Sequence, residues 1–315
     1  MNKCLVTGAT GFIGHYLVRE LKKRGYWVRA SGTHYNNFVN EADDFKKGSL
    51  VLKENCTTVV KDIDYVFHLA AKIGGIKYIS ENESSIMHDN AIMDMNMIEA
   101  SAHSGVKKFF YSSSACVYPA RTTESFNPEP ITEIMAYPAN PEVGYGWEKI
   151  YMEQTLARYQ REGRLDIKIA RFFSTYGPEM EYEGDNVKSL IALCRKVIEA
   201  EDGGEIEIWG PGKQTRAFCH VTDVVDGIIK LMESKHHGPY NIGNADSISI
   251  NKLAIFLIRL SGKKLKIKNI PGTVGVKGRR CSSYLANKDL KWKREISLSA
   301  GAKETYEWVK GEMEK

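Results

Sequence analysis

The sequence predicts an α/β protein whose sheet is parallel and doubly wound, with helices on both faces. Two observations lead to this class. Short apolar runs alternate with longer segments of helical periodicity through residues 1–173, and a glycine-rich turn and a helix follow the first run at once. Strands that alternate with helices form parallel sheets, because each helical crossover brings the chain back to the same edge.

The first strand, turn and helix predict a phosphate-binding site. Residues 3–7 form the apolar run, glycines follow in a G-x-x-G-x-x-G pattern, and residues 12–24 have helical periodicity. Glycines let the backbone approach a pyrophosphate, and the helix N-terminus presents free N–H groups to it. A tight turn without a ligand is the weaker alternative in this context. The expected cofactor contacts are Gly8, Thr10, Gly11, Phe12, Ile13 and Gly14.

The second strand, residues 27–31, lacks the acidic residue that usually follows it in NAD-binding folds. Gly32 occupies the expected position, and no carboxylate follows until Glu41. Arg29 and His34 could tolerate the 2′-phosphate of NADP, although no arginine occupies the usual position. We therefore predict NAD as the cofactor and leave NADP open.

Further elements extend the sheet. Strands are expected at 64–71, 107–112 and 166–172, and helices at 83–105 and 144–163. The first of these strands ends in mostly small side chains, against which a cofactor can lie closely: Leu69, Ala70 and Ala71. The methionines of the helix at 83–105 indicate packing in the core or in a dimer rather than a ligand cluster.

The pattern loosens after residue 173. Short strands are expected at 205–209, 217–221, 240–242 and 264–270, and helices near 187–200, 224–234, 250–261 and 300–314. We expect a dinucleotide-binding domain over residues 1–173 that takes back the chain near 218–242. Residues 174–217 and 243–315 would then form a smaller C-terminal α/β lid over the substrate.

The composition suits a soluble globular enzyme, with 43% hydrophobic and 26% charged residues among 315. The net charge of +5 permits an anionic small molecule as substrate and does not indicate nucleic acid. No apolar run approaches the roughly 18 residues of a membrane span, and the first strand leaves no room for a signal peptide. The six cysteines show no C-x-x-C pair and no metal-binding spacing with histidines, so we expect free thiols, no metal and a cytoplasmic location.

Tyr145 and Lys149 predict proton-transfer chemistry. Residues four apart share one face of a helix, so the ammonium should lie beside the phenol and lower its pKa from about 10. Such a phenol can take a proton from a sugar hydroxyl while hydride leaves the same carbon. An isolated pair of this kind is common on helices, but here three serines, including Ser114, lie upstream at the end of a predicted strand.

Further motifs follow in order along the chain: Arg171-Phe172-Phe173, Tyr176-Gly177-Pro178, Arg216 before a strand, and Tyr240-Asn241-Ile242-Gly243. With the glycine turn, the serines and the Tyr-Lys pair, they resemble over the whole length the extended short-chain dehydrogenase/reductase superfamily, which acts on nucleotide sugars. The resemblance implies a Rossmann sheet, bound NAD, and Tyr145 as the residue that oxidises C4 of the sugar. It also implies that Ser114 hydrogen-bonds O4 and that Lys149 holds the cofactor ribose.

Within that superfamily the chain is similar to the GDP-mannose 3,5-epimerases. The most specific match is Ser114-Ala115-Cys116-Val117-Tyr118-Pro119. Oxidation of C4 to a ketone acidifies the C–H bonds at C3 and C5, and the resemblance implies that Cys116 and Lys188 exchange those protons as an acid–base pair. The alternatives are a buried structural thiol at Cys116 and a solvated helix lysine at Lys188.

The same resemblance implies the substrate-binding residues Gly75, Ser114, Cys116, Ser174, Lys188, Gln214, Arg216 and Arg279. Three polar positions depart from the family pattern. Gly32 replaces the ribose-binding acid, Ser174 replaces an asparagine that touches the diphosphate, and the segment 280–283 lacks an acidic residue. The sugar therefore need not be mannose.

The sequence predicts an NAD-dependent epimerase of a nucleotide-diphospho-sugar, either GDP-mannose or a related GDP-sugar. A GDP-sugar 4-dehydrogenase or a single-site epimerase would use only part of this chemistry. A non-catalytic NAD-binding regulator would use none of it, and intact Ser114, Tyr145 and Lys149 argue against that function. The resemblance also implies a homodimer joined through the helices at 83–105 and 145–162.

Overall fold

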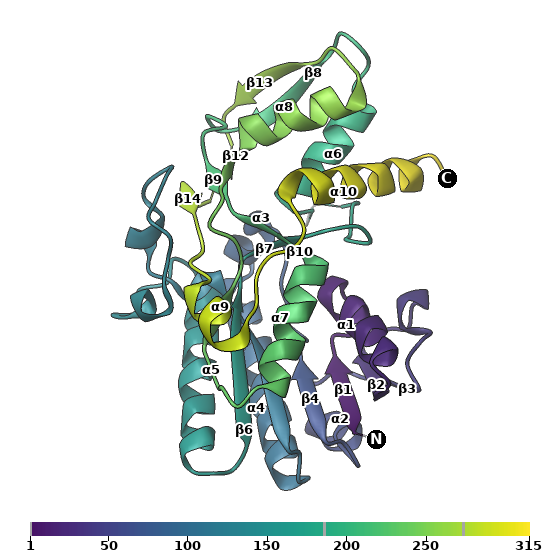
Figure 1. The fold of residues 1–315 in the computed structure, drawn as a ribbon, viewed down its shortest axis with the longest axis vertical. Coiled ribbons are helices and arrows are strands. Elements are labelled where there is room, and N and C mark those ends of the chain that lie inside the picture. The colour runs from purple at the N-terminus through teal and green to yellow at the C-terminus, as the bar shows by residue number, and fades with distance from the viewer. Residues whose placement is uncertain (1, 185–186, 273–274) are drawn as a thin grey trace.

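The computed structural model describes residues 2–184, 187–272 and 275–315. Within these residues seven strands form one parallel sheet in the order β11-β6-β5-β4-β1-β2-β3, which confirms the predicted fold class (Figure 1). The chain adds β2 and β3 on one side of β1 and then β4, β5, β6 and β11 on the other. The carboxyl ends of β1 and β4 therefore form the crevice in which such sheets bind ligands. The strands are β1 Lys3–Thr7, β2 Trp27–Gly32, β3 Asp44–Lys47, β4 Tyr65–His68, β5 Lys108–Ser114, β6 Asp166–Phe172 and β11 Tyr240–Ile242.

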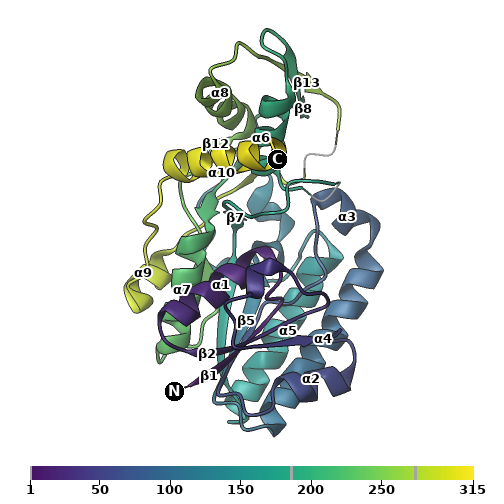
Figure 2. The ribbon, with the colours of Figure 1, turned by 90° about the vertical axis from the view of Figure 1, so that its right-hand side faces the viewer.

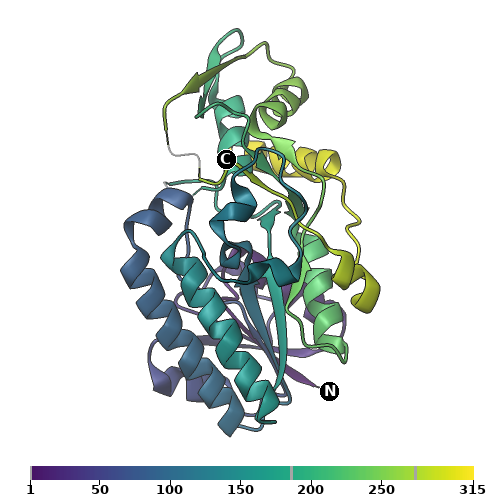
Figure 3. The same ribbon diagram turned by 90° about the vertical axis from the view of Figure 1, so that its left-hand side faces the viewer.

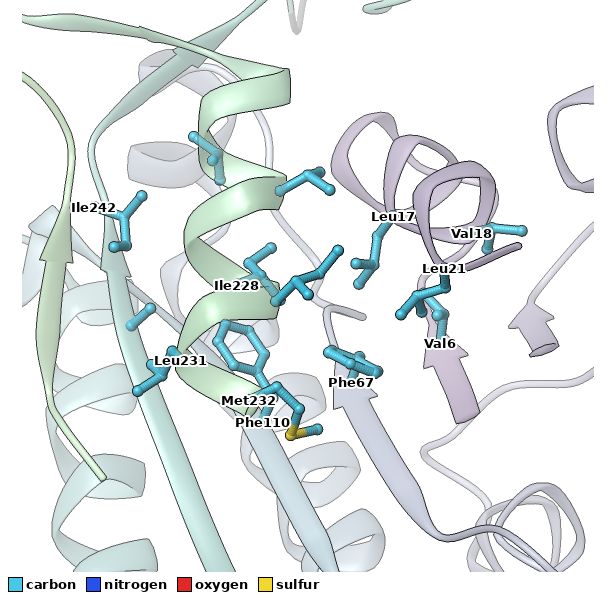
Figure 4. Close-up of a cluster of buried hydrophobic side chains, with 14 of the residues drawn as sticks. Val6, Leu17, Val18, Leu21, Phe67, Phe110, Ile228, Leu231, Met232 and Ile242 are labelled. Carbon is cyan, nitrogen blue, oxygen red and sulfur yellow. The ribbon is translucent and has the colours of Figure 1, made fainter. Parts of the chain in front are cut away.

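Helices cover both faces of the sheet because side chains alternate along each strand. In β1, Cys4 and Val6 belong to the core beneath α1 and α7, whereas Leu5 belongs to the core on the opposite face. Leu17 of α1 and Ile228 of α7 meet over the first face (Figure 4). The first layer contains α1 Phe12–Lys23, α7 Val221–Glu233 and α9 Tyr284–Leu290, and the second contains α2 Lys53–Val59, α4 Glu83–His103 and α5 Gly144–Arg161, with α3 Ile76–Glu81 leading into α4.

A further core lies over the carboxyl ends of the strands, at the top of Figures 1 and 2. Helices α6 and α8 pack against α10 there, and β13 pairs with β8. Between this core and the main sheet, β7 pairs with β10, and β9 lies between β12 and β14. The elements are α6 Ser189–Glu199, α8 Ile250–Ser261, α10 Leu298–Met313, β7 Ser174–Tyr176, β8 Glu205–Trp209, β9 Thr215–Arg216, β10 Phe218–His220, β12 Ile248–Ser249, β13 Lys266–Ile270 and β14 Gly278–Arg279.

The connection from β5 to α5 is a long excursion beside the edge of the sheet, in front of α5 in Figure 3. Ile131 forms a parallel bridge with Cys281, which ties the excursion to the segment after β14. Arg171 on β6 donates to the Glu133 carbonyl at 2.8 Å and holds the same excursion from the sheet side. The short 3₁₀ turns of the chain are Asn37–Val39, Ala115–Val117, Ala120–Thr123 and Glu133–Ala136.

Two expected strands have different ends. The strand expected at 64–71 stops at His68, because the next backbone N–H groups turn to the Thr7 hydroxyl instead of the strand ladder. The strand expected at 217–221 stops at His220, whose side chain accepts from the Thr222 N–H and so caps α7. The chain does return to the main sheet at β11, which pairs with β6. The division into two domains at residue 173 stays a prediction.

The sequence missed β3, α2 and α3, as well as α9 and the short strands β7, β9, β12 and β14. The first of these is a short edge strand with three charged residues in Asp44–Lys47, so it lacks the apolar run by which we recognised the other strands. Lys53–Val59 and Ile76–Glu81 are helices too short to establish a period. In the described parts of the chain, no helix combines the length and the apolar character that a membrane crossing requires.

Candidate active site

A cleft of about 560 Å³ lies at the carboxyl ends of the central strands. The glycine turn, the loop after β4 and the end of β5 line it, and Tyr145 and Lys188 reach it from α5 and from the start of α6. The predicted cofactor contacts among its lining residues are Gly8, Thr10, Gly11, Phe12, Ile13, Gly14, Leu69, Ala70, Ala71 and Tyr145. The structure thus brings most of the predicted site residues to one crevice.

The glycine turn requires its glycines for steric reasons. Gly8 has a φ of +64°, and a Cβ there would lie 2.8 Å from the Ala70 backbone nitrogen. A Cβ on Gly14 would lie 2.1 Å from the Gly8 carbonyl oxygen. The first turn of α1 therefore lies directly against the end of β1, with its free N–H groups at the cleft. This cradle fits a dinucleotide pyrophosphate.

The surroundings of Gly32, at the end of β2, explain why no acidic residue for the ribose occupies this position. A Cβ on Gly32 would come within 2.8 Å of the Thr10 hydroxyl oxygen, so a larger residue would displace that threonine from the turn. The Arg29 guanidinium, which the sequence offered as a phosphate ligand, pairs instead with Asp44 at 2.7 Å and donates to the Val59 carbonyl at 2.9 Å. Arg29 therefore connects β2 to β3 and to the end of α2.

Tyr145 is 4% exposed and lines the cleft, and Lys149 lies wholly buried one turn further along α5. The ammonium is 5.6 Å from the centre of the Tyr145 ring. Burial raises the pKa of Tyr145, and the Lys149 charge only partly opposes that shift. The expected lowering of the phenol pKa is therefore not found in the protein alone, because desolvation of the phenolate outweighs one nearby cation.

Ser114 and Cys116 follow each other at the end of β5. The Ser114 hydroxyl accepts from the Cys116 N–H at 3.1 Å and caps the 3₁₀ turn that carries the thiol. Cys116 is half-buried, and Arg279 Nη1 lies 4.0 Å from its sulfur. The turn thus places the Ser114 residue at the cleft and packs Cys116 against the cluster that contains Tyr145.

Lys188 is the N-cap residue of α6 and lies across the cleft from the sheet. Its side chain is open to the solvent of the cleft, yet protein atoms surround it closely. This crowding lowers the pKa of Lys188, and the charge of Cys116 opposes the shift. The lowered pKa moves this lysine toward the range of an acid–base group.

Arg216 and Arg279 are partners in the register of β9 and β14. Arg216 Nη1 donates to the Thr215 and Val276 carbonyls at 2.8 and 2.9 Å. Burial, followed by the charge of Arg279, lowers the pKa of Arg216 to about 10. Arg279 Nε is buried with no hydrogen-bond partner among the described residues. Two guanidinium groups held together in this way favour an anion between them.

Of the eight predicted substrate contacts, Ser114 and Lys188 line the cleft, and six do not: Gly75, Cys116, Ser174, Gln214, Arg216 and Arg279. Gly75 precedes α3, and Ser174 lies on β7 beside Thr175, which does line the cleft. Gln214 is buried and donates to the Trp209 carbonyl at 2.9 Å. Their roles as substrate contacts stay predictions.

The sequence missed several residues of the site. The loop after β3 contributes Gly48, Ser49, Leu50 and Val51 to the cleft. The sequence did not predict β3, because it has no apolar run, so these loop residues were missed with it. Buried polar groups behind Lys149 were also missed, although a single acid, Asp94, within an otherwise methionine-rich apolar stretch of α4 was a usable signal.

Solved structures of known proteins share this architecture. UDP-glucose 4-epimerase with UDP-glucose from Thermotoga maritima superposes with a TM-score of 0.88 at 26% identity, covering 99% of both chains. UDP-glucuronic acid 4-epimerase from Bacillus cereus, in complex with UDP-glucuronic acid and NAD, superposes with a TM-score of 0.85 at 25% identity, covering 98% of this chain and 99% of the other.

Proteins of similar sequence belong to the same class of nucleotide-sugar enzymes. GDP-mannose 3,5-epimerase from Arabidopsis thaliana is 38% identical over 317 residues, which covers 99% of this chain and 83% of that protein. Residues 4–243 match the NAD dependent epimerase/dehydratase family. These matches confirm the resemblance to nucleotide-sugar enzymes of the extended short-chain dehydrogenase/reductase type. The chain is a member of the NAD dependent epimerase/dehydratase family.

Proposed function

We propose that this chain is an NAD-dependent 3,5-epimerase of a GDP-sugar, with GDP-mannose as the first candidate. The observation that carries the proposal is the arrangement around Tyr145: Lys188 lines the same cleft, and Cys116 packs against the cluster that contains Tyr145 and acts on the pKa of Lys188. The relative from Arabidopsis thaliana is named for that activity. A 4-epimerase needs no second acid–base pair, so the pairing favours the double epimerisation.

The proposed reaction begins and ends at C4 of the sugar. Tyr145 takes the proton of the sugar O4 hydroxyl as its phenolate, which the Lys149 charge stabilises, and Ser114 donates a hydrogen bond to O4. NAD held along the glycine turn would supply the hydride acceptor for the oxidation of C4 and the hydride donor for its later reduction, so the reaction would have no net redox change. Tyr145 returns its proton to O4 in that last step.

The ketone at C4 makes the hydrogens at C3 and C5 acidic. One of Cys116 and Lys188 takes such a proton from one face of the sugar, and the other donates a proton to the opposite face. The group that takes a proton must start deprotonated, and the group that donates one must start protonated. The lowered pKa of Lys188 helps here, because it brings the pH at which this lysine exchanges its proton closer to neutral. Two such exchanges invert C3 and C5.

Arg216 and Arg279 are proposed to hold the diphosphate of the substrate. The buried Nε of Arg279 supplies an unpaired donor among the described residues, and its Nη1 lies beside the Cys116 sulfur. A diphosphate there would place the attached sugar next to the thiol. The positive pair also offsets the loss of the family asparagine at Ser174.

NAD is the proposed cofactor in preference to NADP. Arg29 is paired with Asp44, so it offers no free charge to a 2′-phosphate. Solved relatives such as the Bacillus cereus enzyme are described with NAD. Gly32 and the neighbouring Ser31 and Thr33 line the cleft and leave room for an unmodified ribose.

A homodimer in the cytoplasm is the proposed state of the protein. Trp147 and Tyr151 are 43% and 56% exposed on one face of α5, and Met87 is 36% exposed on the neighbouring α4. Large apolar groups gathered on two adjacent helices suit burial against a second copy. All six cysteines are free thiols, which suits a reducing compartment.

The decisive experiment incubates the NAD-loaded protein with GDP-mannose in deuterated water. The proposal expects deuterium at both C3 and C5 by NMR. Oxidation at C4 without deuterium would support a 4-dehydrogenase, deuterium at one carbon a single-site epimerase, and no change a non-catalytic regulator. UDP-glucose is the matched control, since the solved neighbours act on UDP-sugars by name.

A further inference from the structure

A chain of buried hydrogen bonds runs behind the cleft from the glycine turn to Lys149. The Thr7 hydroxyl contacts His68 Nδ1 at 2.8 Å, and His68 Nε2 contacts Asp94 Oδ1 at 2.8 Å. Asp94 Oδ2 accepts from the Tyr111 hydroxyl at 2.7 Å, and Tyr111 accepts from Lys149 Nζ at 2.8 Å. All five side chains are buried. The proposed mechanism uses only the last of them.

The direction of each hydrogen bond in this chain can be assigned. The Thr7 oxygen already accepts the N–H groups of Leu69 and Ala70, both at 3.2 Å, so its own hydrogen must go to His68 Nδ1. His68 therefore carries its proton on Nε2 and donates it to Asp94. Every bond in the chain thus ends at the Asp94 carboxylate.

Charge reinforces this arrangement. Burial disfavours an ionised Asp94, but Lys149 and His68 outweigh burial and hold the pKa of the Asp94 carboxyl well below its usual range. Burial likewise disfavours the Lys149 ammonium, and the charge of Asp94 raises the lysine pKa above its ordinary value. Each ion keeps the other charged in a place without solvent.

Other charged groups face Lys149 as well. Glu148 Oε2 lies 3.8 Å from the ammonium, and Tyr145 faces it from the same helix. Burial raises the pKa of Glu148 to about 8, and the Asp94 charge adds to that shift. At neutral pH Asp94 is therefore the carboxylate that balances Lys149, and Glu148 is its protonated neighbour.

We propose that Asp94 is a positioning residue that keeps Lys149 charged and fixed beside Tyr145. Lys149 Nζ reaches Asp94 Oδ2 directly at 3.5 Å and also through the Tyr111 hydroxyl. On the other side of Asp94, His68 and Thr7 connect it to the loop that lines the cleft. The inference rests on the proposed function, in which Tyr145 is the base. It adds a group on α4 that touches neither substrate nor cofactor.

The direct test is the ionisation of Lys149 in the NAD-loaded protein. We would follow the Nζ signal of ¹⁵N-lysine-labelled protein by NMR between pH 6 and about 11, with Lys149→Met to assign it. In the unmodified protein Lys149 should stay protonated throughout this range. Asp94→Asn keeps the shape and removes the charge, so the pKa of Lys149 should fall by about 1–3 units and its titration should become visible within the range. A Lys149 that stays protonated throughout in Asp94→Asn as well would overturn the proposal. Adding Glu148→Gln should lower the Lys149 pKa further, because Glu148 ionises once Asp94 is gone.

The kinetic test is deuterium exchange into the GDP-sugar as a function of pH. Asp94→Asn should lose about 100-fold in rate, since a small misplacement of a proton-transfer group has that cost. Its alkaline limb should move to lower pH, because Lys149 then loses its proton more easily. Tyr111→Phe, a milder change, keeps the Asp94 charge and should lower the rate without moving that limb.

Glu153→Gln is the matched control on α5. It removes a carboxylate from another buried ion pair, with Arg171 at 2.6 Å, and should lower stability while the pH profile stays unchanged. If Asp94→Asn behaves like this control, Asp94 is merely structural and the proposal falls. If the unmodified protein exchanges no deuterium with any GDP-sugar, the proposed function falls instead, and the Lys149 titration decides the Asp94 contact alone.

Discussion

At the scale of single residues, the cysteines show how surroundings select a reactive group. Burial raises the pKa of the Cys4, Cys56 and Cys194 thiols to about 12, so these remain protonated and inert. Cys116 is the half-buried exception among the six, and it lies beside Arg279. Its place at the end of β5, rather than its residue type, qualifies it for proton transfer.

Replacement of Cys116 by alanine should block epimerisation and leave oxidation at C4 detectable. The thiol acts on carbon-bound protons after the ketone has formed, and such groups contribute about 10²- to 10⁴-fold. Deuterium incorporation at C3 and C5 measures the loss, and transient absorbance at ~340 nm reports the oxidation. Cys56→Ala, in the buried core, is the control. Normal exchange in Cys116→Ala would make this cysteine structural.

Replacement of Tyr145 by phenylalanine should abolish turnover while NAD stays bound. The change removes only the hydroxyl that transfers the O4 proton, and the glycine turn that is proposed to hold the cofactor remains intact. Turnover and the NAD content of the purified protein are the two measurements. A variant with near-normal rates would show that oxidation at C4 does not depend on this phenol.

At the scale of elements, the pairing of two-residue strands determines the proposed substrate site. β9 and β14 come from distant parts of the chain, and their register sets Arg216 opposite Arg279. β12 supports them from the other side through its antiparallel pairing with β9. Such a small sheet gains little stability by itself, so a bound anion between the arginines should stabilise it.

Alanine at position 279 or 216 should weaken GDP binding far more than NAD retention. Removal of a charged partner from a diphosphate costs about 1.5–3 kcal/mol, or roughly 10- to 150-fold in affinity. Calorimetric titration of GDP into Arg216→Ala and Arg279→Ala measures this effect. Arg280→Ala, whose Nε donates to the Ala245 carbonyl at 2.9 Å, is the neighbouring control. Unchanged GDP affinity in both variants would mean that the substrate lies elsewhere.

At the scale of the whole molecule, the sheet and the upper core meet at the cleft. Residues from the glycine turn, β5, α5 and the start of α6 line it, so the site needs both parts in their observed arrangement. Arg19 of α1 pairs with Glu179 at 2.6 Å, and Tyr16 donates to the Pro178 carbonyl at 3.2 Å. These contacts fasten the helix of the glycine turn to the segment that leads toward α6.

Glutamate in place of Trp147 should convert the proposed dimer to monomers. The exposed face of α4 and α5 would have to bury a charge, which is costly without a partner. Sedimentation velocity measures the change in mass. Ile134→Glu is the control, because Ile134 is 81% exposed on the excursion between β5 and α5. A Trp147→Glu protein of unaltered mass would place the subunit interface elsewhere or exclude it.

The sequence by itself determined the features that depend on local order along the chain. Apolar runs located six of the seven sheet strands, and the G-x-x-G-x-x-G pattern located the turn where β1 meets α1. Periodicity and glycine spacing suffice for these features because neighbouring residues alone decide them. The edge strand β3 and the cleft residues after it were missed, since Asp44–Lys47 carries no such pattern.

Only the tertiary structure decided the features that depend on burial and on distances between remote segments. It raised the pKa of Tyr145 where the sequence predicted a lower one, because desolvation depends on every element packed around the phenol. It also joined Asp94 to Lys149 through Tyr111, from three elements that are far apart in the chain. A pattern in the sequence records which groups are present, but their charge states follow from what surrounds them.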